Sequence, residues 1–257
     1  MTTSSHEYLR QQIEMHKGLS TVYAEKRYKP AYSRVFQTMW NSAICDLAGI
    51  PGNSRVLDYG CGTGILFPEL EKRDYRAIGI DLSMAMLQGR TEPTSVTSIC
   101  ADGTNTPFAD GQFDAVFCRG SIHHLPDIRK AFAEIHRVLK TGGVLVFSEP
   151  SNDSILNRLA RKVMYRASRE FHEEDEGFRR REITPLLEEL GFTIEVSRGF
   201  GFMAYTFAGF PDKLPLLKYV PGNCTITRWL MKLDAVLEHS PLVADMALHW
   251  QLRGRKR

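Results

Sequence analysis

Short runs of consecutive apolar residues alternate with amphipathic stretches through the middle of the chain. Five of these runs have the length of strands and are apolar at successive positions, as strands covered on both faces are. They are Arg55–Tyr59, Ala77–Ile80, Val96–Cys100, Ala115–Arg119 and Val144–Ser148. Apolar residues from Ile128 to Leu139 recur at 3.6-residue spacing, which predicts a helix that Thr141-Gly142-Gly143 ends. The alternation predicts an α/β fold in which helices cover both faces of a parallel sheet.

Two more strands and one more helix are expected toward the end of the chain. Thr184-Pro185 has the residue types of a helix cap followed by proline at the first helical position, and Gly191 would end that helix. Phe192–Val196 is then a sixth strand. Ala244–Leu252 alternates loosely between apolar and polar residues and is predicted as a seventh, antiparallel strand. The fold class is therefore a Rossmann-like, seven-stranded, mostly parallel sheet.

Three stretches fall outside this alternation and are predicted to form a helical cap over the carboxyl ends of the strands. The first, residues 1–50, carries an apolar helical stripe from Val35 to Leu47. The second, residues 151–181, is basic and then acidic. The third, residues 200–240, is rich in aromatic residues and proline. Ligands of such sheets bind beyond the carboxyl ends of the strands, so a cap there would shape a substrate pocket. We divide the chain into a cap segment (1–50), a core (51–199) with a helical insertion (151–181), and a second cap insertion with the last strand (200–257).

Composition and charge exclude some classes of protein. The 257 residues are 43% hydrophobic and 25% charged, which is ordinary for a globular protein, and no apolar run is long enough to span a membrane. Residues 1–10 lack an apolar signal region, so we expect a cytoplasmic protein with reduced cysteines. A net charge of +3 is too small to predict nucleic-acid binding, and the basic residues 253–257 are expected to be a solvated end.

The most informative segment is the glycine loop Asp58-Tyr59-Gly60-Cys61-Gly62-Thr63-Gly64, which follows the first strand. Its spacing is D-x-G-x-G-x-G, whereas the dinucleotide fingerprint is G-x-G-x-x-G without a leading acid. An aspartate in front of the loop would repel a pyrophosphate, and it suits a ligand that carries a cationic amine. The acid-led spacing of the loop therefore argues against a nicotinamide-dependent oxidoreductase, which we keep as an alternative hypothesis.

Two further acids stand where the next strands end. Asp81 ends the second strand and could accept hydrogen bonds from both hydroxyls of a ribose. Asp102 follows the third strand and could accept from an exocyclic amine. A nucleoside that carries an amino acid would use these two acids together with Asp58.

These motifs resemble those of the class I S-adenosylmethionine-dependent methyltransferases, in particular the small-molecule branch that includes the ubiquinone and menaquinone enzymes. The resemblance covers about residues 50–150, and it implies S-adenosylmethionine as the cofactor. It implies that the loop holds the methionine end of the cofactor, that Asp81 holds the ribose, and that Arg119 and Gly120 line the methyl-transfer face through their backbones. The cofactor-binding residues that it implies are Asp58, Gly60, Cys61, Gly62, Asp81, Leu82, Met86, Asp102, Gly103, Arg119 and Gly120.

Catalysis would depend mainly on positioning, because the methyl group of a sulfonium is already activated. A general base is needed only if the acceptor must lose a proton. The candidates are His123 and His124 after the fourth strand and Glu149 at the end of the fifth, although the histidines could also have structural roles. We expect no metal, because neither His123-His124-x-x-Asp127 nor Asn152-Asp153 has the spacing of a metal site.

The expected function is methyl transfer to a partly apolar small molecule such as a lipid, a polyketide or an aromatic metabolite. A catalytically inactive protein that binds the cofactor and acts as a regulator or partner is the alternative outside the enzymes. We expect no nucleic-acid partner. The basic stretch over residues 151–169 could touch anionic lipid, but a lid with a solvated face is favoured over membrane contact. The acceptor, the methylated atom and the oligomeric state stay open.

Overall fold

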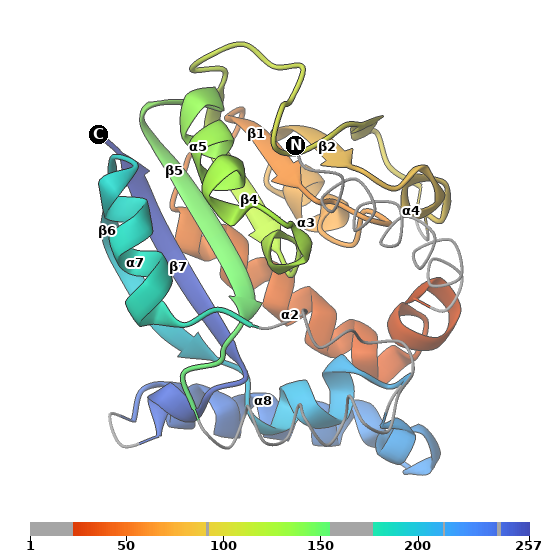
Figure 1. Ribbon diagram of the computed structural model, residues 1–257. Helices are drawn as coiled ribbons and strands as arrows, with labels where there is room; N and C mark the ends of the chain where they lie inside the picture. The colour runs from red at the N-terminus through yellow and green to blue at the C-terminus, as the bar shows by residue number, and fades with distance from the viewer. Residues whose placement is uncertain (1–22, 91–92, 155–176, 213, 241–242) are drawn as a thin grey trace.

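One seven-stranded sheet organises the chain (Figure 1). The computed structural model describes residues 23–90, 93–154, 177–212, 214–240 and 243–257. The strand order is β3-β2-β1-β4-β5-β7-β6, in which β7 alone runs antiparallel to its two neighbours. The strands are β1 (Arg55–Tyr59), β2 (Arg76–Asp81), β3 (Thr97–Cys100), β4 (Phe113–Arg119), β5 (Leu139–Pro150), β6 (Phe192–Phe200) and β7 (His249–Lys256). The predicted fold class is confirmed.

Helices cover both faces of the sheet and bury a separate apolar cluster on each. On one face, α2 (Ala31–Ala48) and α3 (Phe67–Lys72) pack over alternate residues of β1, β4 and β5. On the other face, α5 (Ile128–Val138) and α7 (Arg180–Glu189) pack over the residues between them. The remaining helical elements are η1 (Tyr23–Tyr28), α4 (Met84–Gln88), η2 (Ile122–His124), η3 (Tyr205–Gly209), η4 (Pro215–Tyr219), α8 (Asn223–Glu238) and η5 (Ala244–Met246).

Only part of the predicted cap lies over the carboxyl ends of the strands. The apolar stripe of α2 lies against the face of the sheet through Ile44 and Leu47, while the helix also contacts η3 and α8, with Phe36 packed on Tyr205 of η3. Helix α8 lies beyond the arrowhead of β5 in Figure 1, past the carboxyl end of that strand. Residues 1–22 and 155–176, which include most of the expected helical insertion, lie outside the described residues. The division into segments stays a prediction.

Four sequence predictions need correction at element ends. The seventh strand begins at His249 rather than Ala244, because residues 244–246 form η5. Residues 253–256 are not a solvated end but the second half of β7, where Arg253 and Arg255 both pair with Glu195. Helix α7 begins at Arg180, so Pro185 lies inside it rather than at its first position. Helix α5 ends at Val138, before Thr141-Gly142-Gly143, and Leu139 already belongs to β5.

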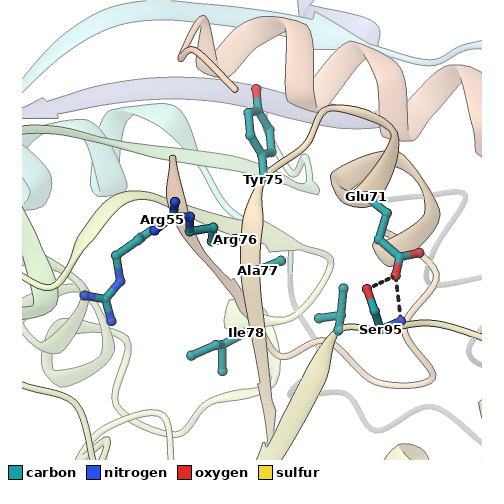
Figure 2. A pocket seen from close by; sticks show the side chains of 8 residues that line it. Arg55, Glu71, Tyr75, Arg76, Ala77, Ile78 and Ser95 are labelled. Carbon is teal, nitrogen blue, oxygen red and sulfur yellow. Dashed lines mark hydrogen bonds between the residues drawn. The ribbon is translucent and has the colours of Figure 1, made fainter. Parts of the chain in front are cut away.

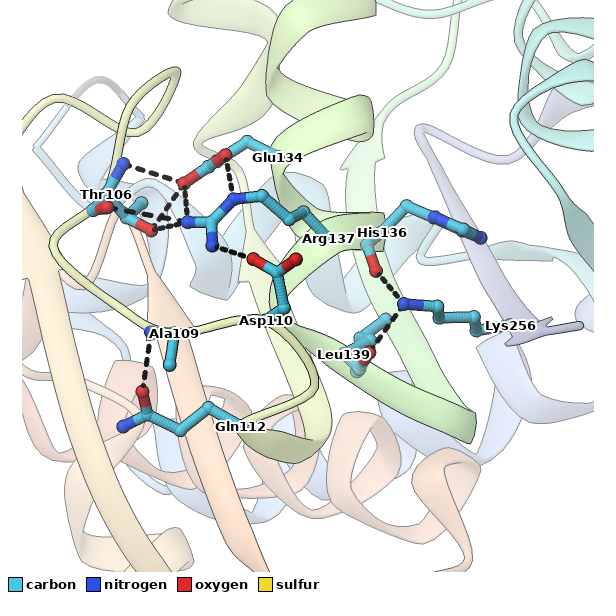
Figure 3. Close-up of polar contacts among 9 residues, drawn as sticks. All are labelled: Thr106, Ala109, Asp110, Gln112, Glu134, His136, Arg137, Leu139 and Lys256. Atoms are coloured by element: carbon cyan, nitrogen blue, oxygen red, sulfur yellow. Dashed lines mark hydrogen bonds and ion pairs between the residues drawn. The ribbon is translucent and has the colours of Figure 1, made fainter.

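A polar network joins α5 to the loop before β4 (Figure 3). Glu134 accepts hydrogen bonds from the backbone N–H and the hydroxyl of Thr106, and Arg137 bridges Glu134 to Asp110. At the end of the helix, the ammonium of Lys256 donates to the carbonyls of His136 and Leu139, which have no partner within the helix. The last strand therefore also caps α5.

Candidate active site

The glycine loop between β1 and α3 is held by backbone hydrogen bonds to the neighbouring strand. The N–H groups of Gly60 and Cys61 both donate to the carbonyl oxygen of Ile80, each at 2.8 Å. Gly60 has a φ of +72°, and a Cβ there would lie 2.3 Å from Cβ of Ser121. Only glycine allows this loop to pack so closely against the turn that follows β4.

Asp81 holds the glycine loop at Gly62 and joins it to the start of α4. Its Oδ2 accepts the N–H of Gly62 and its Oδ1 accepts the N–H of Ser83, both at 2.8 Å. Leu82 is half-buried beside it, and the buried Met86 places its Cε 3.2 Å from where a Cβ of Gly62 would be. The structure thus brings together the loop and the predicted residues of the second strand and α4.

Asp58 is buried beneath this loop with one oxygen unpartnered. Its relative exposure is 2%, and Oδ2 has no hydrogen-bond partner among the described residues. Burial raises the pKa of the Asp58 carboxyl to about 7, the charge of Asp81 raises it further, and the guanidinium of Arg119 opposes the shift. A buried acceptor without a donor costs free energy, so this atom is suited to a ligand that brings an N–H group.

Arg119 places its guanidinium on the same face of the sheet, at the end of β4. Its Cζ lies 4.0 Å from the centre of the Trp40 ring, and its Nη2 donates to the amide oxygen of Gln37. Its Nε is buried and has no partner among the described residues. Burial lowers the pKa of Arg119, and the charge of Asp58 opposes that shift. Only the backbone of Arg119 was expected at the site, and the part played by its side chain could not be seen in the sequence.

Gly120, next along the chain, differs from the loop glycines in its surroundings. Its φ is +63°, yet a Cβ built on it would have no atom within 4 Å. The Cα hydrogen that a side chain would replace therefore points into open space at the carboxyl end of β4. This opening lies where the resemblance places the methyl-transfer face.

Asp102 and Gly103 form a compact turn after β3. Oδ1 of Asp102 accepts both the N–H and the hydroxyl of Thr104, at 2.8 and 2.9 Å. A Cβ on Gly103 would lie 2.3 Å from the hydroxyl oxygen of Tyr59, a buried oxygen without a partner among the described residues. Asp102 therefore stabilises its own turn, and its predicted contact with an amine stays a prediction.

The three predicted catalytic residues are close together. Nδ1 of His123 lies 2.6 Å from Oε2 of Glu149, and the rings of His123 and His124 have centroids 3.9 Å apart. Glu149 is fully buried, and its Oε1 accepts the N–H groups of Ser121 and Ile122 at 2.9 and 3.1 Å. Since three donors already occupy this carboxylate, it is better placed to orient His123 than to take a proton from an acceptor.

A buried polar row that sequence reasoning missed continues toward β7. The indole N–H of Trp40 donates to the hydroxyl of Ser148, whose oxygen lies 3.5 Å from Nδ1 of His249. Nε2 of His249 is in turn hydrogen-bonded to the Tyr205 hydroxyl at 2.5 Å. Ser148 lies opposite Arg119 on the neighbouring strand. The polar row therefore continues, on the same face of the sheet, from the charged residues Asp58 and Arg119. The alternation of residues along the strand could have indicated the face on which Ser148 lies. Nothing in the sequence near His249 indicates that it contacts Ser148 and Tyr205.

A separate cavity of about 340 Å³ lies at the amino ends of β1 and β2, opposite to the strand ends that carry the candidate site (Figure 2). It is lined by Arg55 and Arg76, the first residues of β1 and β2, and by Tyr75 and Glu71. The carboxylate of Glu71 is bound by the backbone N–H and hydroxyl of Ser95. Since ligands of this fold bind at the carboxyl ends of the strands, this cavity is not the candidate site.

The described residues contain neither a helix that could span a membrane nor a cluster that could bind a metal. No helix in the ranges given above is both long enough and apolar enough to cross a bilayer. Within the same ranges, no three histidine, cysteine, aspartate or glutamate side chains are grouped so that they could hold a metal ion.

Comparison with known proteins finds a family match in the centre of the chain. Residues 57–147, which are 91 of the 257, match the family described as "Methyltransferase domain". A demethylmenaquinone methyltransferase of Corynebacterium urealyticum is 41% identical over 110 residues, which are 43% of this chain and 46% of the relative. The chain thus spans about half the length of the curated relatives it matches. The resemblance drawn from the sequence is confirmed over this central stretch.

Solved structures agree on the fold across nearly the whole chain. The [4+2]-cyclase SpnF has a TM-score of 0.68 at 17% identity, with 96% of each chain covered. A phosphoethanolamine N-methyltransferase of Haemonchus contortus, solved with S-adenosyl-L-methionine, has a TM-score of 0.54 at 19% identity and covers 93% of this chain and 60% of its own. At such identities the likeness concerns the fold alone.

Proposed function

We propose that this chain, whose residues 57–147 match the family described as "Methyltransferase domain", transfers a methyl group from S-adenosylmethionine to a small molecule. The observation that carries the proposal is the buried Asp58 carboxylate, which has an unpartnered oxygen beneath a loop that only glycine can form. The bound cofactor would supply a methyl group activated by a sulfonium. The named relative, a demethylmenaquinone methyltransferase, supports the same chemistry.

The charges at the site fit the two ends of an amino acid. Asp58 and Arg119 lie on neighbouring strands and the same face, and each has a buried atom without a partner among the described residues. An ammonium would satisfy Oδ2 of Asp58, and a carboxylate would satisfy Nε of Arg119. We assign these two side chains to the methionine end of the cofactor. Asp81 would accept from the ribose, and Leu82 and Met86 would pack near the adenine.

Apolar walls around the site favour an acceptor with apolar character. Trp40 and Tyr205 pack with Phe36 and Phe210 at the carboxyl end of the sheet. Polar atoms within these walls include the row from Trp40 to His249 and the amide of Gln37. We therefore expect a lipid, polyketide or aromatic acceptor rather than a nucleic acid, and a cytoplasmic enzyme.

His123 is our candidate for a general base if the acceptor is a hydroxyl or an amine. Glu149 would accept the Nδ1 proton of His123, which leaves Nε2 as the atom that can take a proton. If the acceptor needs no deprotonation, positioning alone would carry the reaction and His123 would only shape the turn.

Calorimetric titration of the full chain tests the cofactor. We expect micromolar binding of S-adenosylmethionine and S-adenosylhomocysteine, no binding of NAD, and loss of binding in Asp58→Asn and Asp81→Ala. Asp114→Asn is the matched control, because Asp114 lies near the amino end of β4, away from the candidate site, where it accepts hydrogen bonds from the backbone N–H of Arg55 and from Lys140. Binding of NAD instead of the sulfur nucleosides would refute the proposal.

Methyl transfer needs its own test, because a protein of this fold can be a cyclase. The protein is incubated with labelled S-adenosylmethionine and a demethylated quinone, and S-adenosylhomocysteine is measured. Turnover that requires the acceptor supports the enzyme. Tight cofactor binding without transfer to any quinone, phenol or lipid acceptor would favour the non-enzymatic alternative.

A further inference from the structure

Helix α8 packs one set of apolar side chains, among them Ile226, Leu230 and Met231, against the core, and it presents a second set to solvent. Trp229, Leu233 and Val236 are 67%, 46% and 69% exposed, and their spacing of four and three residues places them on one face of the helix. Asp234 is 2% exposed on the opposite face. The outer face of a surface helix is normally polar, so the outer face of α8 is unusually apolar.

Hydrogen bonds lock α8 in this orientation. The carboxylate of Asp234 accepts the N–H groups of Phe202, Met203 and Ala204 at 2.8 to 3.0 Å. Glu238, one turn later, accepts the N–H of Gly201 at 2.8 Å. These backbone groups are the unpaired donors at the start of the helical turns that include η3. Rotating α8 to bury its tryptophan would break all four bonds, so the apolar face stays outward.

The segment before α8 continues the same kind of surface. In η4 and the residue after it, Leu216, Tyr219 and Val220 are 57%, 80% and 37% exposed. Single exposed apolar residues are ordinary, but six within one short part of the chain mark an interaction surface. We call the exposed side chains of residues 216–236 the α8 face.

The charges on the α8 face are all positive. Residues 214–239 contain two acids, Asp234 and Glu238, and both are bound to backbone N–H groups on the inner side. The exposed charges are Lys218, Arg228 and Lys232. Lys218 and Lys232 each lie beside an aromatic ring of the same face, with Nζ 5.2 Å from the centroid of Tyr219 and 5.1 Å from that of Trp229.

We propose that the α8 face docks this protein on the surface of an anionic membrane. Tryptophan and tyrosine favour the boundary between lipid and water, and lysine and arginine beside them attract anionic headgroups. The apolar residues would enter the boundary region while the cations contact headgroups. The face lies past the carboxyl end of β5, at the same end of the sheet as the candidate active site, so docking would bring that site toward the membrane (Figure 1).

Flotation of the full chain with vesicles tests this proposal without measuring activity. We expect binding to vesicles of phosphatidylcholine and phosphatidylglycerol, weaker binding as salt rises, and little binding to phosphatidylcholine alone. Lys232→Glu should weaken binding by about an order of magnitude, because each cation near an anionic surface contributes about a fivefold gain in affinity. Trp229→Ser should weaken it at every salt concentration.

Matched controls separate the α8 face from general charge and hydrophobicity. Arg181→Glu changes the net charge equally on α7, and Met84→Ser removes a similarly exposed apolar side chain from α4; both should bind as the wild type does. Equal binding to neutral vesicles, equal loss in the controls, or no binding by the wild type would each overturn the proposal. So would a dimer that Trp229→Ser dissociates in the absence of any vesicle binding, because a second copy would then cover the face.

Discussion

Nδ1 of His123 lies 2.6 Å from a carboxylate oxygen of Glu149, and this pair joins the turn after β4 to the end of β5. Glu149 has no exposed surface and also accepts the N–H groups of Ser121 and Ile122. Ser121 in turn packs against Gly60 of the glycine loop. One carboxylate therefore fixes both the candidate base and the wall against which the loop rests.

Replacing Glu149 should separate its structural role from its effect on His123. Glu149→Ala leaves three buried donors unpaired and should lower the free energy of unfolding by about 3 kcal/mol. Glu149→Gln keeps an oxygen for Ser121 and Ile122 but presents an NH₂ group to His123, so it should favour the other histidine tautomer. We expect near-normal stability and a kcat that falls at least about tenfold.

Denaturation curves and ¹⁵N spectra of the histidine ring check these two expectations. His123→Asn should lower kcat as much as Glu149→Gln does, and the double variant should be no slower, because the two residues would act as one unit. A normal kcat in both single variants would show that the pair is only structural.

The pKa of Asp58 predicts a stability that falls as pH rises. The carboxyl titrates near 3.8 in the unfolded chain and at about 7 in the folded protein, so between these values the folded state binds more protons. The free energy of unfolding should therefore decrease from pH 4 to pH 7, by about 1.4 kcal/mol for each unit of pKa shift. Urea titrations across this range, with Asp58→Asn as the variant that lacks this slope, measure the effect.

Cofactor affinity should change with pH in the opposite direction. An ammonium is attracted only to the ionised form of Asp58, so the affinity for S-adenosylhomocysteine should rise as pH passes through about 7. Calorimetry at a series of pH values gives this profile. An affinity that does not vary with pH would mean that Asp58 does not contact the ammonium.

Two glycines on facing segments should respond differently to alanine. Gly60→Ala places a Cβ 2.3 Å from Cβ of Ser121 and should destabilise the protein by more than about 3 kcal/mol. Gly120→Ala meets no atom within 4 Å and should cost only the backbone strain of its positive φ, about 1–2 kcal/mol. If the opening at Gly120 belongs to the cofactor site, this variant folds but binds S-adenosylhomocysteine more weakly. Thermal unfolding and calorimetry of the two variants decide the matter.

The network of Figure 3 should make the junction between α5 and the loop before β4 sensitive to acid. The hydrogen bond from Arg137, with those from Thr106, lowers the pKa of Glu134 to about 2, against 4.5 in the unfolded chain. The carboxylate therefore stabilises the fold fully above pH 4.5, and this contribution is lost as pH falls toward 2. Glu134→Gln should be less stable than the wild type at pH 6, and the difference should shrink in acid.

Glu189→Gln is the matched control for this prediction, since Glu189 forms an exposed pair with Arg129. Its unfolding free energy should follow that of the wild type throughout the titration. A constant difference between Glu134→Gln and the wild type from pH 6 to pH 2 would contradict the prediction.

The central strands and the glycine loop were predictable because their signals are local. A buried parallel strand is apolar at most of its positions, as Val56, Leu57 and Tyr59 are in β1, and the loop's spacing lies in consecutive residues, so β1 was predicted with its observed bounds. Element ends were less predictable. Pro185 suggested a helix start, but packing of Ile183 and Leu187 against the sheet extends α7 backward over it.

The parts of the site that depend on distant segments could not be predicted. Nothing near Arg119 in the sequence shows that Trp40 would stack on it, and nothing near His249 indicates Tyr205. The pairing of Arg253 and Arg255 with Glu195 was equally hidden, because four basic residues among the five of 253–257 are typical of a solvated end. Contacts of this kind follow from the strand order, which the sequence pattern leaves open.

The place of β7 between β5 and β6 has a consequence for the order of folding. Strand β6 is synthesised before β7, yet in the finished sheet β7 is its one neighbour among the described strands. Until residues 249–256 leave the ribosome, the edge of β5 is open and β6 has nothing to pair with. Two strand edges are therefore unpaired at that stage, and we expect direct pairing of β5 with β6 to be the kinetic trap for this topology.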